Sequence, residues 1–110
     1  MTYALRFLPE VEDDVFRGYS WYESKSPGLG EEFLRMFYAS AGDIPRNPLL
    51  YQKVHGEFRR SLLRRFPYAI YFVIDQDAII VPVFSTVPAI LVQSNQDSKT
   101  EDDLFVGSTQ

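Results

Sequence analysis

The chain has 110 residues, 45% of them hydrophobic and 15% aromatic, with a formal net charge of −4 at pH 7, which fits one small domain with one apolar core. It has no cysteine and a single histidine, His55, which excludes disulfides, thiolate metal sites and a histidine cluster. No apolar run reaches the length of a membrane span, and the start lacks a basic region followed by an apolar stretch, so we expect a cytoplasmic protein with no membrane contact.

The first segment alternates apolar and other residues, which predicts a short strand over residues 3–7. Pro9 follows, with four acidic residues in the next five positions. Proline suits the first turn of a helix, and carboxylates suit the positive end of its dipole. Val11, Val15, Tyr19 and Tyr22 recur at helical spacing. The pattern therefore predicts a first helix from about Pro9 to Lys25, ended by the "SPG" at residues 26–28.

A second helix is predicted to begin near Leu29, with Glu31 and Glu32 in its first turn. Its apolar stripe consists of Phe33, Met36, Phe37, Ala41 and Ile44. Pro45 and Pro48 end it. Two such helices joined by a short break form a helical hairpin, and we expect both aromatic stripes to belong to the core.

Strand patterns dominate the rest of the domain. Residues 58–65 alternate imperfectly, residues 70–74 alternate clearly, and residues 78–84 form a near-continuous apolar run. Pro82 cannot donate a ladder hydrogen bond, so we expect a bulge or an unpaired position there. The predicted fold class is α+β with two layers: an N-terminal strand, a helical hairpin and a three-stranded antiparallel meander, forming a four-stranded sheet complete by Phe84.

The usual signatures of small-molecule chemistry are missing. The stretch "GLGEEF" at residues 28–33 reads as a helix start, because it lacks the lysine and the preceding strand of a phosphate loop. His55 lies beside Gly56 and is interpreted as a turn residue rather than a general base. Glu10, Asp13 and Asp14 are interpreted as first-turn acids. The sequence thus predicts no metal site and no cofactor.

Positive charge gathers in one stretch. Residues 1–84 carry ten Lys/Arg and eleven Asp/Glu, whereas residues 85–110 carry one and four. Within residues 53–65, Glu57 is the one acid among five cations: Lys53, Arg59, Arg60, Arg64 and Arg65. Such a patch could bind nucleic acid or an acidic protein segment. The alternative interpretation is a solvated strand with basic outer positions.

The order of elements and several stretches resemble the ParE branch of the RelE/ParE toxin superfamily, small bacterial toxins of type II toxin–antitoxin modules, often labelled plasmid stabilisation proteins. The resemblance covers about residues 3–84. It rests on "FLPEVEDDV", "SPGLGEEF" and above all "RRSLLRRFPYAIYF" followed by "IIVPVF".

The resemblance implies a protein that inhibits a macromolecular target and is neutralised by a cognate antitoxin. ParE-like members poison DNA gyrase by binding, whereas RelE-like members cut mRNA on the ribosome. Arg59, Arg60, Arg64 and Arg65 are the positions that could contact phosphate or an acidic partner, and alternatively Arg60 or Arg64 organises the sheet through ion pairs. The last strand offers no acid–base residue for RNA cleavage, so no catalytic residue is assigned. A third reading is an inactive, degenerate toxin that only binds antitoxin. The oligomeric state is not predicted.

The family pattern ends at Ser85, where "STVPAIL" follows "VF". Members of the family usually have a histidine there, followed by Arg-Asp-Pro or Arg-Asn-Pro. Codons for residues 84–91, read with an offset of one base, can encode "FHCSRDP", which contains this family pattern. We therefore infer a change of reading frame at Phe84. The alternative is a natural tail that has diverged from the family. Residues 1–84 are therefore interpreted as the toxin domain and residues 85–110 as an atypical tail, which we expect to be disordered because residues 94–103 contain no apolar side chain.

Overall fold

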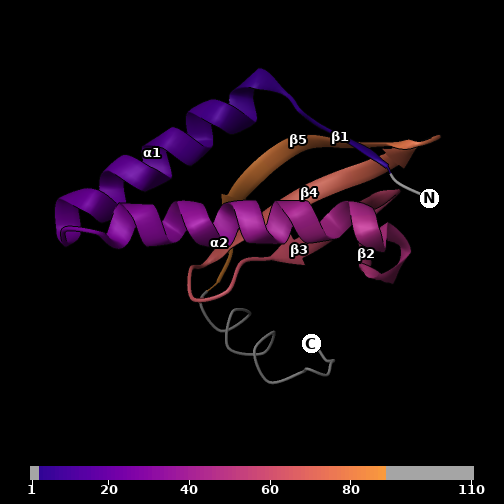
Figure 1. The fold of residues 1–110 in the computed structure, drawn as a ribbon. Helices are drawn as coiled ribbons and strands as arrows, with labels where there is room; N and C mark the ends of the chain where they lie inside the picture. The colour runs from indigo at the N-terminus through magenta and orange to yellow at the C-terminus, as the bar shows by residue number, and fades with distance from the viewer. Residues whose placement is uncertain (1–2, 89–110) are drawn as a thin grey trace.

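The computed structural model describes residues 3–88, which form one sheet and a pair of helices (Figure 1). The elements follow one another in this order: β1 (Ala4–Phe7), α1 (Pro9–Lys25), α2 (Leu29–Asp43), the 3-10 turns η1 (Ile44–Arg46) and η2 (Pro48–Leu50), β2 (Lys53–His55), β3 (Phe58–Leu62), β4 (Tyr68–Asp75) and β5 (Ala78–Thr86). None of the helices in this part of the chain is long and apolar enough to cross a membrane.

The sheet has the strand order β1-β5-β4-β3-β2. β1 runs parallel to β5, and the other neighbours are antiparallel. Buried residues of α1 and α2 share one core with residues of β4 and β5, so both helices lie on the same face of the sheet. The predicted two-layer α+β fold is confirmed.

The sheet differs from the prediction in three places. It has five strands rather than four, because residues 53–55 form β2 at the edge beside β3. β3 ends at Leu62, so residues 63–65 belong to a loop. β5 continues through Ser85 and Thr86, two residues past the expected end, because both pair with β4. The predicted disorder lies mainly in residues 89–110, outside the described residues.

The sequence predicted both ends of α1 and the start of α2, but α2 ends at Asp43 and Ile44 already belongs to η1. Pro9 occupies the first turn of α1 together with Glu10 and Glu12. Between the helices, Gly28 adopts a left-handed conformation with φ 88°, which glycine tolerates without a steric penalty. The Glu23 carboxylate then accepts hydrogen bonds from the backbone N–H of Gly28 (3.1 Å) and of Gly30 (2.9 Å). These bonds satisfy donors that the start of α2 cannot pair within the helix.

Two glycines allow the helices and the core to approach closely. A Cβ on Gly18 would lie 2.6 Å from Cζ of Phe33, and a Cβ on Gly30 would lie 2.8 Å from the carbonyl oxygen of Tyr19. Neither distance is compatible with a real side chain. The hairpin therefore depends on the absence of a side chain at these two positions.

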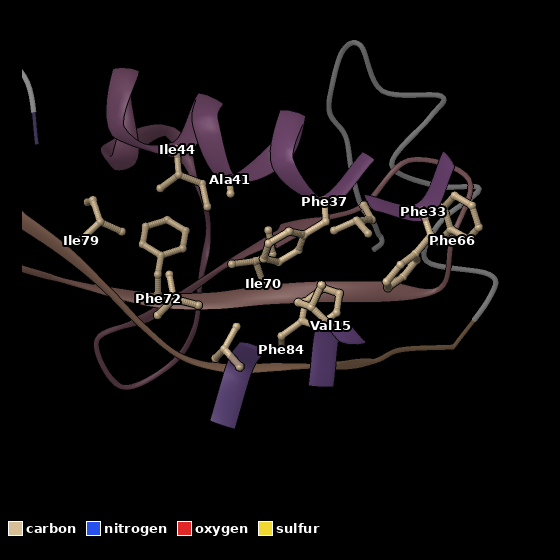
Figure 2. Packing of buried hydrophobic residues seen from close by; sticks show 13 residues of the cluster. Val15, Phe33, Phe37, Ala41, Ile44, Phe66, Ile70, Phe72, Ile79 and Phe84 are labelled. Atoms are coloured by element: carbon tan, nitrogen blue, oxygen red, sulfur yellow. The ribbon is translucent and has the colours of Figure 1, made fainter. Parts of the chain in front are cut away.

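Phenylalanines fill the space between the layers (Figure 2). Phe33 of α2 is fully buried, and its ring centroid lies 5.3 Å from that of Phe66 and 6.0 Å from that of Phe84. Phe37 lies 5.0 Å from Phe84 in an edge-to-face arrangement. The prediction that the stripe of the second helix is core is thus confirmed for Phe33, Phe37, Ala41 and Ile44.

The expected irregularity at Pro82 is present. Tyr71 pairs with Val83, but Val73 pairs with Ile80, so the register shifts by one residue. Val81 and Pro82 therefore both lie opposite Phe72, as in a β-bulge. This arrangement accommodates a residue that has no backbone N–H to donate.

Candidate functional site

The five cations predicted as binding residues make different contacts within the domain. Arg59 and Arg60 lie in β3, and Lys53 lies opposite Arg59 in β2. β3 ends three residues earlier than expected, so Arg64 and Arg65 lie in the loop that follows it. The structure therefore separates them by their contacts, and their roles differ.

Arg59 supports the backbone of the neighbouring segment. Its guanidinium donates a hydrogen bond of 2.7 Å to the carbonyl oxygen of Tyr51 and one of 3.4 Å to that of Leu49. Leu49 lies within η2, and Tyr51 is the residue that follows it. Arg59 thus has a structural role in the domain, and its predicted role in partner binding stays a prediction.

Two other cations are ion-paired. Nζ of Lys53 lies 3.1 Å from a carboxylate oxygen of Glu57, the acid predicted to stand alone among the five cations. Arg65 pairs with Glu32 of α2 and has a positive φ of 71°, which is uncommon for a residue with a side chain. The ion pair ties the loop between β3 and β4 to the helical layer. The alternative that Arg60 or Arg64 organises the sheet through an ion pair is not supported among residues 3–88, where neither arginine has an ion pair.

Arg60 and Arg64 remain. Neither has a side-chain hydrogen bond or an ion pair with any residue in the described range 3–88. Arg60 lies opposite Tyr71, which in turn lies opposite Val83. Because directly opposed residues point to the same side of a sheet, these three side chains share the face away from the helices.

The helical layer exposes aromatic side chains of its own. Phe16 is 67% exposed, Tyr38 61% and Trp21 55%. Phe16 stacks on Tyr19 at 6.4 Å, and Lys25 lies over the ring of Trp21 at 4.8 Å. We call Phe16, Trp21 and Tyr38 the helix aromatics. None of the three belongs to the apolar stripes predicted from the sequence, and this position outside the stripes is the sequence signal of their exposure.

Comparison with known proteins identifies the fold and the family. No protein-family model matches the sequence. Over 80 residues the chain is 30% identical to Toxin ParE2 of Mycobacterium tuberculosis, in the strains CDC 1551 / Oshkosh and ATCC 25618 / H37Rv, and the match covers 72% of this chain and 76% of the relative. The chain belongs to the ParE toxin family. In fold it matches a chain of the chromosomal ParDE TA system from P. aeruginosa, with a TM-score of 0.69, 14% identity, and coverage of 78% of this chain and 97% of that one.

Among residues 3–88, the side chains whose pKa is shifted are three tyrosines packed near the core. Burial raises the pKa of Tyr51, Asp43 raises it further, and a hydrogen bond with Ser61 lowers it. Burial also raises the pKa of Tyr22 and of Tyr68. All three therefore stay neutral at physiological pH and serve packing.

His55, the single histidine of this ParE toxin, ends β2 and is exposed. The turn residue is instead Gly56, whose φ of 55° closes the link between β2 and β3. Among residues 3–88, no three His, Cys, Asp or Glu side chains are grouped as metal ligands would be. What the geometry does supply is Arg60 beside Tyr71 on the sheet, Arg64 in the loop after β3, and exposed aromatic side chains on the helical layer. Cations and exposed aromatic side chains are groups that bind acidic and apolar protein segments.

Proposed function

We propose that this protein is the toxin of a bacterial type II toxin–antitoxin module, that it inhibits DNA gyrase by binding, and that a cognate antitoxin neutralises it. The observation that carries the proposal is the 30% identity with Toxin ParE2 over 80 residues. The similar fold of a chain from a ParDE toxin–antitoxin system supports the antitoxin as a partner.

The proposed antitoxin contact uses the exposed helix aromatics and the two arginines whose side chains have no hydrogen bond or ion pair among residues 3–88. An amphipathic antitoxin segment would cover the helix aromatics, because large exposed aromatic side chains are typical anchors of protein interfaces. Acidic antitoxin side chains would pair with Arg60 and Arg64. Arg59, Lys53 and Arg65 contribute less, because each already has a partner within the domain.

Calorimetry tests this placement. The double substitution Arg60→Glu and Arg64→Glu reverses two free cations and should weaken antitoxin binding about tenfold or more. Arg46→Glu is the control, because Arg46 lies on η1, away from both cations in the chain, and it should change the affinity less than about twofold. Unchanged affinity of the double variant would contradict the assignment of the arginines.

Induction in a bacterial host tests the toxic activity, and two assays separate the targets. Growth arrest together with inhibition of gyrase supercoiling supports the proposal. Growth arrest with translation-dependent mRNA cleavage would instead assign the RelE-like activity, a ribosome-dependent endoribonuclease. Antitoxin binding without growth arrest is the outcome expected of a degenerate toxin that lost its native C-terminus through the inferred frame change. Sequencing the gene tests that change directly, because codons incompatible with "FHCSRDP" in the offset frame would exclude it.

A further inference from the structure

The sheet has a second face, on the side away from the helices. Strand pairing places Val83, Tyr71 and Arg60 in one row across β5, β4 and β3 on this face. Leu62 lies two residues after Arg60 in β3 and therefore points to the same side. We call Leu62, Tyr71 and Val83 the open-face patch. The register of the sheet thus places its three side chains on one surface.

The open-face patch is accessible within residues 3–88. Val83 is 44% exposed, and Leu62, Tyr71 and the adjacent Arg60 are half-buried. Phe72, next to Tyr71 in the strand, points the other way and is part of the core under the helices. One aromatic and two aliphatic side chains therefore lie beside a cation. Such a surface fits a segment that carries both carboxylates and apolar residues.

The charge at this end of the face is positive. Arg64 follows Leu62 by two residues, and neither Arg60 nor Arg64 has an ion pair or a side-chain hydrogen bond among residues 3–88. Of the nearby acids, Glu57 is paired with Lys53. Asp75 lies at the other end of β4, roughly 13 Å along the strand from the row that contains Arg60. The two arginines are therefore available to carboxylates from outside residues 3–88.

The chain itself carries a segment of the matching chemistry. Residues 101–106 read "EDDLFV", three carboxylates followed by three apolar residues. β5 leaves the sheet at Thr86, which is three residues after Val83 of the open-face patch. The connection over residues 89–100 can span up to about 40 Å, whereas β3 lies two strands from β5, or roughly 10 Å away. The segment can therefore reach the patch of its own chain.

We propose that residues 101–106 bind the open-face patch of the same chain. Their carboxylates pair with Arg60 and Arg64, and their apolar residues cover the patch. A tether of this length gives an effective concentration on the order of millimolar, so a contact with an intermolecular Kd of about 1 mM is occupied about half of the time. The contact depends on the residues that the chain carries and not on toxicity. One consequence rests on the proposed function: the segment would compete with the antitoxin for the two arginines.

Paramagnetic broadening in NMR spectra of the full chain tests the contact. The chain has no cysteine, so Gly107→Cys provides a single site for a nitroxide label directly after the segment. The label should reduce the amide signals of Arg60 and Tyr71 by about half or more, because the contact is occupied about half of the time. The amides of Phe16 and Trp21 lie in α1, on the other layer, and should keep their intensity.

An exchange of charges separates the contact from the effect of the tether alone. Arg60→Glu together with Arg64→Glu should restore the amide signal of Tyr71 in the labelled chain. Adding Asp102→Lys and Asp103→Lys should bring the broadening back, because the charges are again opposite. Arg46→Glu is the matched control: it reverses an exposed arginine of η1 and should leave the broadening unchanged.

Three results would overturn the proposal. The first is a label that leaves the Tyr71 signal unchanged or broadens α1 equally. The second is broadening that survives the reversal of Arg60 and Arg64. The third is broadening in a mixture of spin-labelled chains and separate isotope-labelled chains, which would assign the contact to two copies rather than one. None of these readouts involves growth arrest or gyrase, so failure of the contact leaves the proposed toxin function untouched.

Discussion

A single methyl group at Gly18 should destabilise the whole domain. The Cβ of Gly18→Ala would lie 2.6 Å from Cζ and 2.8 Å from Cε2 of Phe33, well inside contact distance. Phe33 is fully buried, and its ring also packs against Tyr22 at 5.2 Å and Tyr68 at 5.1 Å. The ring therefore cannot move aside without displacing other aromatic side chains.

The expected magnitude is a balance of two effects. Overpacking a well-packed core costs about 1–3 kcal/mol. Replacing glycine by alanine within a helix stabilises the helix by up to about 1 kcal/mol. Gly18→Ala should therefore lower the free energy of unfolding by about 1–2 kcal/mol, which corresponds to a fall in Tm of roughly 5–10 °C in a domain of this size.

Gly42 provides a matched control for the same substitution. It lies in α2, and a Cβ there would meet nothing within 4 Å. Gly42→Ala should stabilise the domain by about 0.5 kcal/mol, because only the helix-propensity effect remains. Urea unfolding followed by circular dichroism measures both variants. A Gly18→Ala domain as stable as the wild type, or a Gly42→Ala domain equally destabilised, would refute the packing argument.

Three further predictions use the same unfolding measurement. Arg59→Met removes both hydrogen bonds to the η2 backbone and should cost about 1–2 kcal/mol, whereas Arg60→Met should change stability by less than about 0.5 kcal/mol; equal effects would contradict the structural role of Arg59. Glu23→Ala leaves two N–H groups at the start of α2 without an acceptor and should cost about 1 kcal/mol; no loss would argue against the cap. The pKa of Tyr51 is raised above its ordinary value of 10.0, so the folded state keeps a proton that the unfolded chain releases. Stability should therefore be full below about pH 10 and fall as the pH rises above it, and a flat profile would exclude the shift.

The helical half of the domain was readable from the sequence because its signals are local. Pro9, the acidic first turn and the "SPG" break locate both ends of α1 and the start of α2, whereas α2 ends at Asp43, before the prolines expected to end it. The stripe at Phe33, Phe37 and Ala41 then decides which side of α2 is buried. Each of these signals acts within a few residues of the structure that it predicts.

The sheet edge and the roles of the arginines were not readable, because they depend on contacts distant in sequence. Arg65 pairs with Glu32, 33 positions earlier. β2 has only three residues, all exposed, so its sequence lacks the apolar alternation that would predict a strand. The sequence does not distinguish Arg59 from Arg60. In the structure, Arg59 donates a hydrogen bond to the backbone carbonyl of Tyr51, whereas Arg60 lies opposite Tyr71 on the face of the sheet away from the helices.

The end of β5 shows which residues the fold needs at the C-terminal side of the sheet. Phe84 is the last core residue of the described chain, since Ser85 and Thr86 are exposed. Both nevertheless pair with β4, opposite Ala69 and Tyr68, through backbone groups that any residue other than proline provides. A frame change after Phe84 would therefore leave the core and the strand intact while it replaces every later side chain. Such a change would also leave in place the residues proposed to bind the antitoxin, because Arg60, Arg64 and the helix aromatics all precede Phe84.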